Sequence, residues 1–150
     1  MEGFEDPATY SGYIFSLTNM KGTNDGSSVE MWVKNAGAYG TPNLKVGGFR
    51  MTDSATPTYV QESATNIKLS YAGNSSTEYG HSGTVRWDNY HGTLSASAAP
   101  HFQSNMGAFD RNRNYGISMV FGQVDAVGGL TGVRFKCNVG SLTSGTITVH

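Results

Sequence analysis

The chain is poor in cysteine, and this limits both cross-linking and metal chemistry. Cys137 is the only cysteine among 150 residues, so no internal disulfide can form. Zinc frameworks built from several cysteines, or from cysteines and histidines together, are excluded for the same reason. Because Cys137 falls on the apolar side of an alternating pattern, we expect a buried and unreactive thiol.

Charge is also scarce, and neither sign dominates. Charged residues make up 14% of the chain, and ten Lys and Arg stand against 11 Asp and Glu, which leaves a formal net charge of −1. Proteins that bind nucleic acid usually carry a basic field that neutralises phosphates. The composition therefore argues against nucleic acid as a partner.

Long apolar runs are missing as well. A membrane-spanning helix needs about 18 or more consecutive apolar residues, and no stretch of this sequence provides them. The opening residues lack a basic segment followed by an apolar one, so a signal peptide is not expected. We predict no membrane insertion.

Helical periodicity is absent, whereas period-two alternation recurs along most of the chain. Such alternation predicts strands with one face toward a core, and the 20 glycines suit tight turns between them. The length suits one domain over residues 1–150. We predict an all-β fold, an antiparallel β-sandwich that is jelly-roll-like with about eight to nine strands. A closed barrel is the structural alternative.

Strand parity also predicts which residues lie between the sheets. The expected core residues are Phe15, Val33, Leu69, Trp87, Phe121 and Phe135. The pair Gly47–Gly48 interrupts one alternating stretch and is expected to form a bulge or a bend. Residues 132–149 alternate on both sides of a glycine-containing turn, which is typical of a hairpin. Residues 90–116 lack alternation, so we expect a loop there with at most one helical turn.

No motif brings catalytic or metal-binding groups together. The histidines at positions 81, 91, 101 and 150 lack the short spacings of metal sites and are expected on the surface. The stretch around Ser82 nearly matches a nucleophile elbow, but its last glycine is replaced by Thr84 and a strand pattern, not a helix, follows. We therefore predict no catalytic residue, no metal and no cofactor.

Aromatic and basic residues beside glycine and asparagine mark a candidate contact surface. Segments 79–90 and 101–115 hold the densest mixture of these residue types. Loops on a rigid sandwich are where recognition is usually placed, and aromatic residues there serve both sugar binding and subunit contact. The candidate contact residues are Trp32, Tyr79, Tyr90, His101, Phe102, Phe109, Arg111, Arg113 and Tyr115.

Several motifs resemble a β-sandwich module of tailed-bacteriophage virion proteins. The opening carries a Y-x-x-Y-x-F-x-L-x-N strand, from Tyr10 to Asn19, and then a T-x-D-G turn at Thr23–Gly26. The stretch SGTVRWDN is similar to the middle strand of that module. Its ending is matched by Gly132, Arg134, Phe135, Gly140, Ser144, Gly145 and Thr146. These motifs are structural, so the resemblance transfers no catalytic residue.

The resemblance implies a non-enzymatic structural protein on the virion surface. A tail-fibre or receptor-binding role is expected first, and a capsid decoration or head-fibre role is the alternative. A lectin-like or carbohydrate-active module is the competing class, because jelly rolls host all of these functions. The expected partners are further copies of the chain, as a homotrimer, other virion proteins and a host cell-surface glycan.

Overall fold

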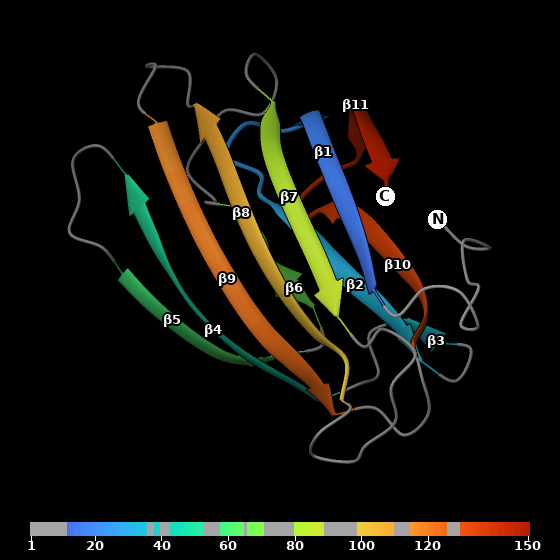
Figure 1. The fold of residues 1–150 in the computed structure, drawn as a ribbon. Helices are drawn as coiled ribbons and strands as arrows, with labels where there is room; N and C mark the ends of the chain where they lie inside the picture. The colour runs from blue at the N-terminus through green and yellow to red at the C-terminus, as the bar shows by residue number, and fades with distance from the viewer. Residues whose placement is uncertain are drawn as a thin grey trace.

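The alternating stretches form strands in a computed structural model of the chain. It describes residues 12–35, 38–39, 43–52, 58–64, 66–70, 80–88, 99–109, 115–125 and 130–150. Within these residues there are eleven strands in two antiparallel sheets (Figure 1). No helix long and apolar enough to cross a membrane is found among the same residues.

The two sheets differ in size. The strands of the larger sheet are β1 (Gly12–Gly22), β4 (Asn43–Thr52), β5 (Thr58–Ala64), β7 (His81–Asp88), β8 (His101–Phe109), β9 (Tyr115–Asp125) and β11 (Leu142–Val149). Their order in space is β11-β1-β7-β8-β9-β4-β5. The strands of the smaller sheet are β2 (Val29–Asn35), β3 (Ala38–Tyr39), β6 (Ile67–Lys68) and β10 (Leu130–Cys137). In this sheet β2 is paired with β10, β3 and β6.

Strand pairs are nested from the two ends of the chain inward. β1 pairs with β11, β2 with β10, β4 with β9 and β7 with β8. Nesting of this kind results when one long hairpin is rolled up, and it is typical of a jelly roll. The predicted antiparallel β-sandwich is therefore confirmed. The described strands outnumber the prediction because no strand was predicted at β3 or at β5, and β8 lies where a loop was expected.

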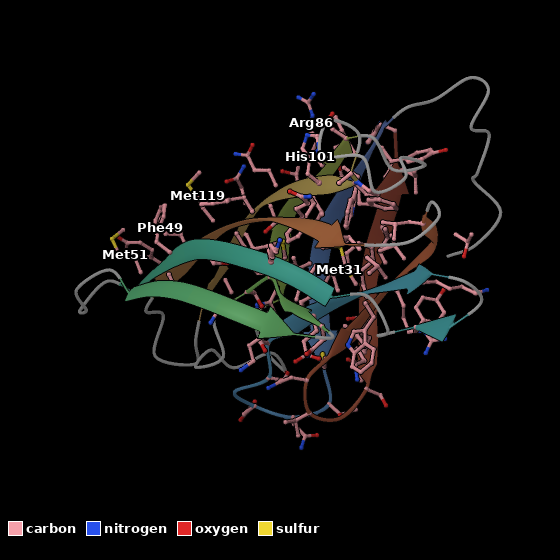
Figure 2. The ribbon with its side chains drawn as sticks, turned by 90° about the horizontal axis from the view of Figure 1, so that it is seen from below. Met31, Phe49, Met51, Arg86, His101 and Met119 are labelled. Carbon is pink, nitrogen blue, oxygen red and sulfur yellow. The ribbon has the colours of Figure 1, made fainter. Side chains whose placement is uncertain are left out.

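The core lies between the two sheets. Phe15 of β1 meets Phe135 of β10 edge to face there, with ring centroids 5.5 Å apart. Met31 of β2 lies between the layers in Figure 2 and is fully buried. Five of the six predicted core residues are buried, namely Phe15, Val33, Leu69, Trp87 and Phe135.

Phe121 is the wrong member of that prediction, because β9 faces the other way. Its side chain is 59% exposed, and Met119 also points outward, whereas Ser118 and Val120 are buried. Alternation had suggested that the bulkier apolar set of β9 faces the core. A serine can occupy the inward position because the Ser118 hydroxyl donates a hydrogen bond to the carbonyl of Leu69.

The Gly47–Gly48 pair forms no bulge, so the bulge is the wrong half of the prediction of a bulge or a bend. β4 keeps an unbroken register with β5 and β9 through both glycines. A Cβ on Gly48 would lie 2.3 Å from the carbonyl oxygen of Met119, and one on Gly47 would lie 3.3 Å from the Phe121 ring. The pair thus permits close strand approach and leaves room for that ring. A register shift occurs in β1 instead, between Thr18 and Lys21.

The last two strands do not form the predicted hairpin. β10 pairs with β2, whereas β11 crosses to the larger sheet and pairs with β1. The crossing turn is tied to the turn before β2, because the Thr23 N–H donates to the Ser141 carbonyl over 2.9 Å. The Ser141 N–H donates in return to the Thr23 hydroxyl over 3.1 Å. Gly140 adopts a φ of 74° in this crossing, which other residues rarely accept.

Candidate functional site

The predicted contact residues that the structure describes do not form one surface. Tyr79, Tyr90, Arg111 and Arg113 lie outside the described residues, as does the side chain of Phe109. Phe102 is buried and packs against Trp87, with ring centroids 5.0 Å apart, so that part of the prediction is wrong.

The predicted contact loop at 101–115 is a strand over most of its length. Residues 101–109 form β8 in the middle of the larger sheet. His101 is exposed on the outer face of this sheet, and Tyr115 is exposed at the start of β9. Trp32 is half-buried on the outer face of the smaller sheet. The three described contact residues that reach solvent therefore belong to two different faces.

The outer face of the smaller sheet carries aromatic and cationic residues together. Trp32 and Lys34 alternate with core residues on β2, and Arg134 and Lys136 do the same on β10. Arg134 lies opposite Trp32 in the ladder that joins these strands. On the other side of β2, Tyr39 lies opposite Lys34, and Lys68 lies opposite Glu30. We call this surface the basic–aromatic face, defined by Trp32, Lys34, Tyr39, Lys68, Arg134 and Lys136.

Two of these cations lie directly over aromatic rings. The Lys136 Nζ is 4.0 Å from the centre of the Trp32 ring. The Arg134 guanidinium is also 4.0 Å from the centre of the Tyr39 ring. The negative face of an aromatic ring attracts a cation by about 0.5–1 kcal/mol at exposed sites. Gly132 makes room for this packing, since a Cβ there would lie 3.0 Å from the Tyr39 hydroxyl.

The basic–aromatic face also carries one carboxylate, that of Glu30, and this residue is buried. Glu30 is only 5% exposed although its neighbours Val29 and Met31 face the core. The Trp32 indole N–H donates to the Glu30 Oε2 over 3.2 Å. Neither Arg134 nor Lys136 forms an ion pair with any described residue. The solvent-facing charge of the basic–aromatic face is therefore positive, in a chain whose net charge is −1.

The outer face of the larger sheet carries an apolar stripe instead. In the ladder between β4 and β9, Phe49 lies opposite Met119 and Met51 opposite Ile117. Figure 2 shows Phe49, Met51 and Met119 close together on the side of the sheet that also carries Arg86 and His101. We call this surface the apolar stripe, defined by Phe49, Met51, Ile117, Met119 and Phe121.

Arg50 lies between two stripe residues in sequence but points the other way. Its Nη2 donates to the carbonyl of Lys68 over 3.2 Å, which ties β4 to β6. At this end of β4 the cation Arg50 therefore lies inside and Phe49 and Met51 lie outside. Farther along the strand the arrangement is reversed, with Lys45 exposed and Val46 buried. The five residues of the apolar stripe are uncharged, and the exposed Lys45 lies on the same outer face farther along β4.

A small polar cluster lies beside the stripe on the same face. Arg86 donates from Nη2 and Nε to the Asp88 Oδ1, over 3.0 and 3.2 Å. The His101 Nε2 is 3.9 Å from the Asp88 Oδ2. These groups are solvent-exposed, where ion pairs contribute about 0–1 kcal/mol. Within the part of the chain that is described, no group of three or more His, Cys, Asp or Glu is placed to hold a metal.

His81 is fully buried, which corrects the expectation that it lies on the surface. Its Nε2 donates to the carbonyl of Ser27 over 3.1 Å. Burial lowers the pKa of His81, and the hydrogen bond to Ser27 opposes that effect in part. His101 and His150 are exposed as predicted, and His91 lies outside the described residues.

Cys137 is buried, as the alternation on β10 predicted. Burial raises the pKa of the Cys137 thiol, the hydrogen bond with Ser27 lowers it, and the nearby Glu30 raises it. The reactive thiolate is therefore disfavoured in the folded chain.

Arg134 and Lys136 were missed as candidate residues. A signal was present, because Arg134 and Lys136 alternate with apolar residues on the polar side of their strand, as Trp32 does on its own. The pairing of β2 with β10, which brings these residues together, joins segments about a hundred residues apart and leaves no local trace in the sequence.

Comparison with known proteins gives no relative for this fold and these surfaces. No protein-family model matches the chain, and no curated protein or solved structure matches it.

Proposed function

We propose that the chain is a non-enzymatic structural protein on the surface of a tailed-bacteriophage virion, of the tail-fibre or receptor-binding type. The observation that carries the proposal is the difference between the two outer faces of one sandwich. One face offers the apolar stripe, and the other offers the basic–aromatic face. Both are built on strands that share a single core, so neither depends on a loop for its shape.

The apolar stripe is suited to contact between copies of the chain. Its side chains are uncharged, so two copies can meet there without repulsion of like charges. Methionine and aromatic residues are enriched in the centres of protein interfaces. The basic–aromatic face, in contrast, would repel a second copy of itself. We therefore assign assembly, including the expected homotrimer, to the stripe and recognition of another molecule to the basic–aromatic face.

The described residues also favour a binding role over an enzymatic one. Arg86, Asp88 and His101 form one polar cluster, and no nucleophilic side chain of a described residue is hydrogen-bonded to them. Catalysis needs convergent groups with tuned pKa values in a sheltered site. These three side chains instead lie on an open sheet face.

The test is to locate the chain on the particle and to alter the basic–aromatic face by substitution while the apolar stripe is kept. Antibodies against the purified protein should label intact virions of the phage that encodes it. Virions carrying Arg134→Gln with Lys136→Gln should assemble in normal numbers but adsorb to host cells more slowly. Normal adsorption together with fragile capsids would favour the decoration role. Absence of the chain from purified virions would contradict the proposal.

A further inference from the structure

We infer that the basic–aromatic face binds an acidic polysaccharide, one whose sugar units carry carboxylate or sulfate groups. The inference deepens the proposed function, on which it rests for its biological setting, by naming the class of ligand. Its physical basis lies in the cations of β10 and the rings beneath them.

Arg134 and Lys136 present two cations from one face of one strand. Residues two apart on a strand lie about 6.6–6.8 Å apart along it, so the two charges can meet anionic groups on successive parts of an extended chain. Neither side chain forms an ion pair or a hydrogen bond with a described residue. Their N–H donors are consequently available to oxygen atoms of a ligand.

The aromatic rings prepare these cations for binding. Lys136 is held over Trp32 and Arg134 over Tyr39, so each long side chain is already restricted before a ligand arrives. Ordering such side chains at an interface otherwise costs about 0.5–1.5 kcal/mol each. Trp32 and Tyr39 are themselves half-buried, and their exposed parts offer apolar surface to the C–H face of a sugar ring.

Charge density favours an acidic polysaccharide over a nucleic acid. Duplex DNA carries one charge per about 1.7 Å, and tight binding typically uses about 6–10 phosphate contacts. The basic–aromatic face has four cations, with the Glu30 carboxylate beneath them, in a chain of net charge −1. A polymer whose charges are more widely spaced than those of DNA matches these four cations better. The Trp32 indole N–H is already committed to Glu30, so the ring contributes its apolar surface.

Tryptophan fluorescence offers a direct test with the full chain. Trp87 is 1% exposed, so quenching by acrylamide reports mainly on Trp32. Oligogalacturonate, which is carboxylated, and dextran sulfate should each protect Trp32 from quenching, and added salt should weaken both. The polysaccharide that binds more tightly shows whether the face prefers carboxylate or sulfate groups. Neutral dextran should have no effect. Single-stranded DNA binding more tightly than both acidic polysaccharides would overturn the inference.

Matched variants locate the binding surface. Arg134→Gln with Lys136→Gln should weaken binding of the preferred acidic polysaccharide by about tenfold or more, equivalent to about 1.4 kcal/mol. Arg86→Gln removes an exposed arginine from the other sheet and should leave binding unchanged. Equal losses in both variants, or none in the double variant, would contradict the inference. A thermal unfolding curve for each variant verifies that it is folded.

The proposal of a virion protein and the inference of an acidic polysaccharide ligand can be contradicted independently of each other. A purified chain that binds acidic polysaccharide but is absent from virions would leave the inference standing and overturn the virion proposal. A chain present on virions that binds neither polysaccharide would overturn only the inference.

Discussion

His81 is a buried base whose protonation the fold opposes. The ring is enclosed, and its Nε2 donates to the Ser27 carbonyl, so the neutral form satisfies that bond. Burial lowers its pKa below the ordinary value of 6.5, at which it titrates in the unfolded chain. Below pH 6.5 the unfolded state therefore binds more protons than the folded state. The stability that depends on neutral His81 is complete above this pH and is lost as the pH falls toward the lower folded pKa.

We expect the free energy of unfolding, measured by urea titration, to decrease as the pH is lowered from 7 to 5. For one proton the slope is at most about 1.4 kcal/mol per pH unit. His81→Gln keeps a hydrogen-bond donor but cannot titrate, so its slope should be smaller. His101→Gln, at an exposed position, should retain the slope of the natural sequence. An identical slope in both variants would show that His81 is not its source.

Gly145 is required by backbone conformation as well as by space. It has a φ of 135°, and a Cβ there would lie 2.9 Å from the Cα of Met20. We expect Gly145→Ala to lower the free energy of unfolding by about 1–3 kcal/mol. Gly107 is the matched control, because a Cβ there would meet nothing closer than 3.9 Å. Gly107→Ala should change stability by less than about 1 kcal/mol, and either sign is acceptable.

At the scale of the strand, β9 places its bulkier apolar side chains on the exposed face and not in the core. Phe135 on β10 and Phe121 on β9 have the same side chain, but only Phe135 lies in the core. We expect Phe135→Ala to cost about 3–5 kcal/mol and Phe121→Ala less than about 1 kcal/mol. Chemical unfolding of the two variants under the same conditions measures the difference. Similar losses would mean that Phe121 is buried in solution, against the orientation of β9 described above.

The same strand shows what alternation can and cannot predict. On β1, β7 and β10 the bulkier apolar residues face inward, so Phe15, Trp87 and Phe135 were correctly placed in the core. On β9 both faces contain apolar residues, and alternation states only that the faces differ. Which face the second sheet covers depends on topology. β8 was missed because serine, glycine and alanine share its sequence with Phe102 and Met106, which weakens the apolar signal.

The candidate site was predictable only in part for a related reason. Trp32 could be recognised because a large aromatic ring on the polar side of a strand is unusual. Its partners Lys136 and Arg134 are set by the register between two distant strands. A slip of one residue in that register would send both cations to the core face, so no local pattern could have predicted the cluster.

At the scale of the whole molecule, the apolar stripe predicts self-association. Sedimentation velocity at micromolar concentration should show a species larger than the 16.0 kDa chain. Met119→Lys with Phe121→Lys places like charges in the proposed interface and should yield the monomer with an unchanged circular dichroism spectrum.

Arg134→Gln with Lys136→Gln is the control for this experiment, because it alters the other face and should leave the oligomer intact. A natural chain that sediments as a monomer would remove the role assigned to the stripe.

The pairing of β1 with β11 determines when folding can finish. Phe15 lies opposite Val149, so this ladder closes a loop that contains every other described strand. Contacts so distant in sequence form slowly, because the loss of chain entropy precedes the gain from pairing. Until β11 has left the ribosome, one edge of β1 has unpaired N–H and C=O groups and can recruit strands from other chains. When β11 docks, its exposed Ser144, Thr146 and Thr148 give the sheet a polar edge. The final step of folding thus also ends the period in which aggregation is easiest.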